Sequence, residues 1–113
     1  MQRMIAFVAG IGNYSVYEKL KNPVRDSQAI KCLLETQNAE VFYVSDCTIE
    51  EFQEKFNSFE AAIKPGDTAF LYYAGHAAKY KNSLRLIAKS KSSTQDLEAD
   101  SLNLDKLIAR LIA

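Results

Sequence analysis

The sequence predicts a single α/β domain built on a mostly parallel sheet with helices on both faces. Three observations support this. Three apolar runs lack polar alternation, which is typical of strands buried on both faces, as in parallel sheets. Amphipathic helical patterns separate the runs, and this alternation implies right-handed crossovers between parallel strands. The chain has 113 residues, enough for one domain and too few for two.

The first half of the chain contains two predicted strands and a helix between them. Residues 3–11, RMIAFVAGI, are a continuous apolar run that stops at Gly10 and Gly12. Residues 22–37 place a proline near a helix start and repeat apolar side chains at helical spacing. Residues 39–45, AEVFYVS, are the second strand. Together they predict a βαβ unit.

The middle of the chain repeats this pattern. Residues 48–64 carry the clearest helix signal, since Thr48 and Glu51 fit a capping box and apolar side chains follow along one stripe. Residues 68–75, TAFLYYAG, are apolar throughout and predict the third strand. A strand order of 2-1-3 would leave the third strand with an open apolar edge over Phe70–Tyr73. Natural sheets avoid such edges, so we expect another segment or chain to pair with it.

The last third of the chain is less regular. After a polar loop, residues 83–88, SLRLIA, predict a short strand within a hairpin-like excursion. Residues 89–100 resemble a mobile linker, and residues 101–113 predict a closing helix with an apolar stripe.

Composition excludes several classes of partner. Fourteen basic and fourteen acidic residues cancel, so no net field attracts nucleic acid or anionic lipid. No apolar run reaches the ~18 residues of a membrane span, and the N-terminal run lacks a cleavage site, so we interpret it as a strand rather than a signal peptide. Cys32 and Cys47 lack metal-type spacing and fit reduced thiols in the cytoplasm. We predict no metal and no cofactor.

The only histidine, His76, follows the third predicted strand directly. Ligands of open α/β sheets gather at the carboxyl ends of strands, and imidazole is the side chain best suited to move protons near neutral pH. Gly75 before it allows a sharp turn. Two interpretations stay open: His76 is a catalytic base, or it is a structural histidine bonded to a nearby carbonyl.

Two other features at this end of the sheet have competing interpretations. The stretch AGIGNYS has only two of the three glycines of a dinucleotide-binding turn, and Asp46 lies just past the second strand, so a turn that only bends the chain is favoured. Asp26, near the start of the first helix, is either a helix-dipole acid or a carboxylate that faces the site.

Cys47 is not expected to be a nucleophile for His76, because two strand spacings separate them by about 10 Å.

These residues carry a family resemblance. RMIAFVAGIGNYSVYEKLKNPVRDSQAIKCLLE together with PGDTAFLYYAGHAAKYKNSLRLIA resembles the caspase-like cysteine peptidases, nearest to the paracaspases and metacaspases. YYAGH is the most specific motif, and NY…LKNPVRD supports it independently. The resemblance implies a three-layer caspase-hemoglobinase (Rossmann-like) fold, with residues 1–113 as the N-terminal, large-subunit-like part of one domain that lacks the C-terminal strands.

The resemblance also implies site roles and a peptide or protein substrate. His76 matches the catalytic base, the backbone N–H of Ala77 matches the oxyanion donor, and Asp26 matches an acid that lines the S1 pocket for arginine or lysine. Leu20 lies near where true caspases carry an arginine for cleavage after aspartate, so a basic P1 residue is expected. Ala77 stands where the family usually has glycine, which would restrict the backbone if φ were positive there.

The family's nucleophilic cysteine follows a fourth strand, and this chain contains no residue that matches it. We therefore expect the nucleophile to come from a continuation past Ala113 or from a second chain, and the 113-residue chain alone to be inactive. Two alternatives remain. The first is an inactive pseudo-peptidase that pairs through its free edge, either with a homologue or with a second copy of itself as a homodimer. The second is a small ligand-binding α/β domain that uses GIGNY.

Overall fold

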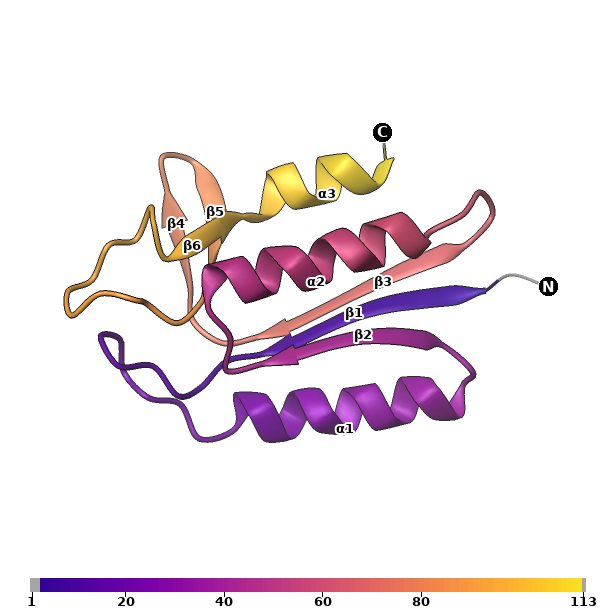
Figure 1. Cartoon of the computed structure of the whole chain (residues 1–113), viewed down its shortest axis with the longest axis horizontal. Helices are drawn as coiled ribbons and strands as arrows, with labels where there is room; N and C mark the ends of the chain where they lie inside the picture. Colours follow the sequence, from indigo (N-terminus) through magenta and orange to yellow (C-terminus); the bar gives the residue numbers. More distant parts are fainter. Residues whose placement is uncertain (1–2, 113) are drawn as a thin grey trace.

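Three parallel strands form the main sheet. Figure 1 shows the computed structural model, which describes residues 3–112. Strands β1 (Met4–Gly10), β2 (Glu40–Ser45) and β3 (Thr68–Ala74) lie in the order β2-β1-β3. This confirms the predicted order. The sheet places the C-terminal ends of β1 and β3 side by side, since Gly10 is in register with Ala74.

Helices α1 (Pro23–Thr36) and α2 (Ile49–Ala62) pack against opposite faces of this sheet (Figure 1). Alternating side chains of β1 serve the two faces. Ala6 and Val8 pack in a small cluster with Leu34 of α1, whereas the fully buried Phe7 faces α2. The chain runs apolar through β1 because both faces of this central strand are covered.

An aromatic cluster joins α2 to the sheet. The ring of Phe7 lies 5.0 Å from that of Phe52 and 5.3 Å from that of Phe56, both in edge-to-face arrangements. The predicted capping box begins the helix: the Thr48 hydroxyl accepts from the Glu51 N–H, and the Glu51 carboxylate accepts from the Thr48 N–H at 2.9 Å. The box fixes where α2 starts and so which aromatic side chains face the core.

A second, antiparallel sheet contains three of the six strands within residues 3–112, and the sequence does not predict this sheet. Strands β4 (Ala77–Tyr80), β5 (Ser83–Ile87) and β6 (Ser101–Asn103) lie in the order β4-β5-β6. Only β5 was predicted as a strand. The sequence predicts a polar loop in place of β4 and the start of the closing helix in place of β6, and both predictions are wrong.

The closing helix is shorter than predicted. α3 spans Leu104–Ile112, and the Asn103 side chain accepts a hydrogen bond from the Lys106 N–H at 3.2 Å, as an N-cap residue does. Because Asn103 caps the helix, Ser101 and Leu102 are free to pair with β5. Residue 113, predicted as the end of this helix, and residues 1 and 2 of the predicted domain lie outside the described residues.

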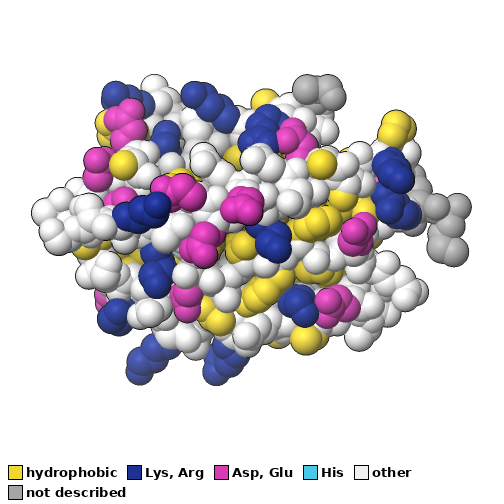
Figure 2. All heavy atoms as spheres, viewed as in Figure 1, with side chains coloured by type: hydrophobic (Ala, Val, Ile, Leu, Met, Phe, Trp, Pro, Cys, Tyr) yellow, Lys and Arg dark blue, Asp and Glu magenta, His cyan; other side chains and the backbone are white. Residues whose placement is uncertain are grey.

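The segment from 89 to 100, predicted to be a linker, is attached to the rest of the chain at several points. The Gln95 amide donates to the Val16 carbonyl at 2.6 Å, and the Tyr17 hydroxyl donates to the buried Asp100 at 3.0 Å. Figure 2 shows basic and acidic side chains intermixed over the face in view, with apolar side chains between them. That mixture agrees with the neutral net charge.

Candidate active site

His76 lies where the sequence placed it, directly after the C-terminal end of β3. Its side chain is half-buried, and its ring packs against Tyr14 at 4.7 Å between centroids. The Nε2 atom lies 2.7 Å from the Glu18 carbonyl oxygen. A carbonyl oxygen only accepts, so Nε2 carries the proton of this bond and Nδ1 of a neutral ring keeps its lone pair. The hydrogen bond to a nearby carbonyl that a structural histidine would make is therefore present. The same bond leaves Nδ1 able to act as a base.

The loop that presents Glu18 is held by the end of β2. The Asp46 carboxylate accepts from the backbone N–H groups of Gly12 and Asn13, both at 2.9 Å. The loop then closes on itself, because the Leu20 N–H donates to the Gly12 carbonyl at 2.9 Å. A side chain at Gly12 would collide with the Leu20 carbonyl, so the close approach requires glycine.

These contacts weaken the dinucleotide interpretation of GIGNY. A phosphate-binding turn offers unpaired N–H groups to the ligand, directly before a helix. Here the N–H groups of Gly12 and Asn13 donate to Asp46, and α1 begins only at Pro23. The turn bends the chain and positions the Glu18 segment.

Two phenols surround the backbone of His76, that of the buried Tyr14 and that of the partly buried Tyr73. The His76 N–H donates to the Tyr14 hydroxyl at 3.0 Å, and this hydroxyl donates to the Ile87 carbonyl at 2.8 Å. The Tyr73 hydroxyl lies 2.7 Å from the carbonyl oxygens of both His76 and Ile87. Gly75 makes room for them, since a Cβ there would lie 2.6 Å from the Tyr73 hydroxyl and 2.8 Å from that of Tyr14. The sequence suggests Tyr14 only as part of the GIGNY ligand-binding alternative and does not single out Tyr73.

The N–H of Ala77 points away from β5. The Ile87 N–H donates to the His76 carbonyl at 3.0 Å, so residues 76 and 87 form a hydrogen-bonded position of the β4–β5 ladder. The next pair, Ala77 and Leu86, is then a non-hydrogen-bonded position. Ala77 has no positive φ, so alanine causes no backbone strain here. Its N–H therefore points toward the space outside the hairpin.

An apolar groove runs beside the outer edge of β3. It has a volume of about 710 Å³. Residues of β3, the β4–β5 hairpin, α2 and α3 form its walls, including Leu71, Tyr73, Ala77, Leu86, Leu107 and Ile108. Within residues 3–112, β1 is the only strand that pairs with β3. The groove and the strand edge therefore lie next to the His76–Ala77 turn.

Comparison with protein families decides the assignment. The caspase domain (peptidase C14) matches residues 3–113. This chain belongs to the caspase domain family. A comparison with curated proteins gave no match.

The caspase domain presents Asp26 at the surface. The residue lies in the first turn of α1, half of its side chain is exposed, and its carboxylate is 3.9 Å from the Arg25 guanidinium. No hydrogen bond or ion pair joins Asp26 to His76 within residues 3–112. An acid in a first helical turn is also favoured by the helix dipole, so both interpretations of Asp26 stay open and its S1 role stays a prediction.

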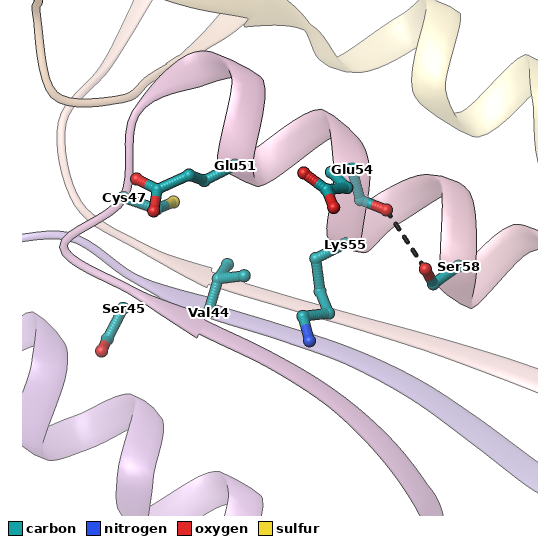
Figure 3. Close-up of a pocket in the computed structure, with 7 residues that line it drawn as sticks. All are labelled: Val44, Ser45, Cys47, Glu51, Glu54, Lys55 and Ser58. Carbon is teal, nitrogen blue, oxygen red and sulfur yellow. Dashed lines mark hydrogen bonds between the residues drawn. The ribbon is translucent and has the colours of Figure 1, made fainter.

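Neither cysteine of the caspase domain is presented as a nucleophile. Cys47 is buried, and burial together with the nearby Glu51 carboxylate raises the pKa of its thiol to about 12. Figure 3 shows it at one end of a surface pocket of about 320 Å³ between the end of β2 and α2, with Lys55 farther along. Cys32 is exposed on α1.

The described part of the caspase domain, residues 3–112, contains neither a metal-ligand cluster nor a membrane-spanning helix. Within residues 3–112, no group of three or more His, Cys, Asp or Glu side chains is arranged to hold a metal ion. None of the helices in that part of the chain combines the length and apolarity needed to cross a membrane.

Proposed function

We propose that this caspase domain contributes the base and the oxyanion donor of a cysteine endopeptidase. One observation carries the proposal: the imidazole of His76 is held through Nε2 by the Glu18 carbonyl, which leaves Nδ1 as the basic atom beside the Ala77 turn. General-base chemistry needs this tautomer, and fixing one ring nitrogen is the usual way to set the other.

In the proposed reaction, a cysteine thiol transfers its proton to Nδ1 of His76, and the sulfur attacks the scissile carbonyl carbon. The carbonyl π electrons move to oxygen, where the Ala77 N–H stabilises the negative charge. His76 then protonates the leaving amine as the C–N bond breaks, and water hydrolyses the thioester. The thiol comes from a segment outside residues 1–113 or from a second chain, because burial keeps Cys47 protonated.

The proposal includes finer assignments that follow from the family resemblance. We propose the paracaspase and metacaspase branch, cleavage after arginine or lysine, and Asp26 as the acid that binds the basic P1 side chain. We also propose the three-layer caspase-hemoglobinase arrangement, in which a further strand pairs with the open edge of β3. Two free thiols fit the reducing cytoplasm, the proposed location.

Turnover of peptides by the full gene product that contains this chain tests the proposal. An arginine-terminated fluorogenic peptide should be cleaved, and His76→Ala should lower kcat/KM about 100-fold or more. Asp26→Asn should lower kcat/KM for the arginine peptide by about 10- to 100-fold, as expected for the loss of a charge-assisted hydrogen bond. Asp105→Asn is the matched control, because Asp105 is also an exposed first-turn acid, on α3.

Three outcomes would contradict parts of the proposal. Unchanged turnover in His76→Ala would remove the peptidase mechanism. Equal effects of Asp26→Asn and Asp105→Asn would leave Asp26 as a helix-dipole acid only. Preferred cleavage after aspartate would overturn the basic P1 assignment.

A second candidate function is a pseudo-peptidase that acts as an interaction partner. The apolar groove beside β3 favours it, because Leu84 and Ile108 on its walls are 42% and 43% exposed. A chain that pairs through β3 should show a mass above the monomer in light scattering. Ile108→Lys should restore the monomer, since it places a charge in the groove. Monomeric behaviour of the unaltered chain at all concentrations would contradict self-association.

A further inference from the structure

We infer that Tyr73 is a positioning residue that orients the N–H of Ala77 by holding the carbonyl of His76. The inference rests on the proposed function, in which this N–H stabilises the oxyanion. Tyr73 is not proposed to contact the imidazole or a substrate carbonyl. It acts through the peptide group between His76 and Ala77.

Peptide geometry provides the first step. The His76 carbonyl and the Ala77 N–H belong to one planar trans peptide unit, so they point in opposite directions and rotate together. Two donors hold this carbonyl: the Tyr73 hydroxyl at 2.7 Å and the Ile87 N–H at 3.0 Å. Fixing the carbonyl toward β5 therefore fixes the Ala77 N–H away from β5.

Hydrogen counting provides the second step. The His76 N–H donates to the Tyr14 hydroxyl, and the Tyr14 proton reaches the Ile87 carbonyl at 2.8 Å. The Ile87 carbonyl has this donor and the His76 carbonyl has the Ile87 N–H, so the single Tyr73 proton can serve either oxygen, each 2.7 Å away. The inference assigns it to the His76 carbonyl, and the measurements below test that assignment. In this arrangement the His76 N–H and the carbonyls of His76 and Ile87 all have partners.

The burial of the two phenols provides the third step. Burial raises the pKa of Tyr73 and, to a smaller extent, that of Tyr14 above the ordinary tyrosine value. Both hydroxyls therefore remain protonated donors across the neutral range. Gly75 admits them, because any larger residue would place its Cβ within 2.8 Å of both oxygens.

Tyr73→Phe in the ¹⁵N-labelled chain tests the inference without any need for turnover. The backbone residual dipolar coupling of Ala77 should change while couplings in α1 and α2 stay the same, because one peptide group rotates and the fold does not. Tyr43→Phe is the matched control: it removes a phenol that bonds to Ser27 at 3.0 Å on the α1 side of the sheet. An Ala77 coupling that is unchanged in Tyr73→Phe would overturn the inference.

The unaltered chain gives a second measurement if Tyr73→Phe does not fold. A through-hydrogen-bond coupling should connect the Tyr73 hydroxyl proton to the ¹³C carbonyl of His76. A coupling to the carbonyl of Ile87 instead would contradict the inference, since Tyr73 would then not hold the peptide of Ala77.

Kinetics separate this inference from the proposed function. In a full gene product that cleaves peptides, Tyr73→Phe should lower kcat about 10-fold with KM nearly unchanged, less than the loss expected for removing an oxyanion donor outright. A product that cleaves nothing, combined with an altered Ala77 coupling, would reject the peptidase function and leave the positioning role intact. An unaltered kcat in an active enzyme would reject the positioning role alone.

Discussion

The two cysteines differ in both properties that control thiol reactivity. Cys47 is 4% exposed, and the pKa of its thiol is raised from 9.0 to about 12, first by burial and then by the Glu51 carboxylate. Cys32 is exposed on the solvent side of α1. Only thiolate is nucleophilic, so burial and the raised pKa both protect Cys47.

Alkylation of the native chain should therefore modify one cysteine. Treatment with iodoacetamide at neutral pH should add a single adduct at Cys32 by mass spectrometry, and unfolding in guanidinium should allow the second at Cys47. Cys32→Ser should remain unmodified until it unfolds. Rapid native labelling of Cys47 would show that the end of β2 opens easily, and would return Cys47 to the candidate nucleophiles.

The position of His76 could be predicted from the sequence, but the hydrogen bonds around its backbone, including those of the Tyr73 hydroxyl, could not. An apolar run that ends in Gly-His places the imidazole at the end of a strand. The hydroxyl partners of Tyr73 are set by long-range packing, since Tyr14 lies 59 residues earlier and Ile87 lies 14 residues later. The alternation of side chains along a strand indicates the face of the sheet on which Tyr73 lies, but it does not indicate which groups its hydroxyl contacts.

At the scale of elements, the strongest local patterns were the most informative. The apolar runs of β1, β2 and β3 and the capping box of α2 fixed these elements to within one or two residues. The sequence predicts a hairpin-like excursion and its second strand, β5, but not its first strand, β4, because the turn between them has an unusual sequence. Lys81 and Asn82 both have positive φ, 49° and 64°, as in a type I′ turn, and lysine is a rare choice there.

Because Lys81 has a positive φ in this turn, a substitution at that position can stabilise the folded chain. Asparagine tolerates positive φ better than lysine does, so Lys81→Asn should stabilise the chain by about 0.5 kcal/mol in urea denaturation. Lys79→Asn is the matched control, because Lys79 is exposed in β4, where asparagine has a lower strand propensity. A loss of stability in Lys81→Asn as large as that in Lys79→Asn would contradict the prediction, since asparagine would then give no advantage at the positive φ of position 81.

At the scale of the whole molecule, four weakly acidic side chains share one property, although Tyr14 and Cys47 are buried and Tyr17 and Tyr73 are partly buried. Tyr14 and Tyr17 come from the loop after β1, Cys47 follows β2, and Tyr73 ends β3. The pKa of each is raised, with burial as the largest cause. Tyr17 also donates to Asp100, whose negative charge further favours the neutral phenol and helps to raise its pKa to about 12.

These raised pKa values make the fold sensitive to alkali. The unfolded chain releases the Cys47 proton near 9.0 and the Tyr17 proton near 10.0, whereas the folded chain holds both until about 12. Above about pH 9 the unfolded state therefore binds fewer protons than the folded state, and stability falls as pH rises. The urea midpoint should be level near neutral pH and should decrease progressively between about pH 9 and 12.

Tyr17→Phe distinguishes this linkage from general alkaline damage. The variant lacks one of the linked protons, so its urea midpoint should fall less steeply with pH above about 10 than that of the unaltered chain. Asp100→Asn should act in the same direction, because without the carboxylate the pKa of Tyr17 returns toward its ordinary value. Parallel pH curves for all three chains would mean that Tyr17 ionises alike in the folded and unfolded states, and that its bond to Asp100 does not hold the 89–100 segment against the first loop.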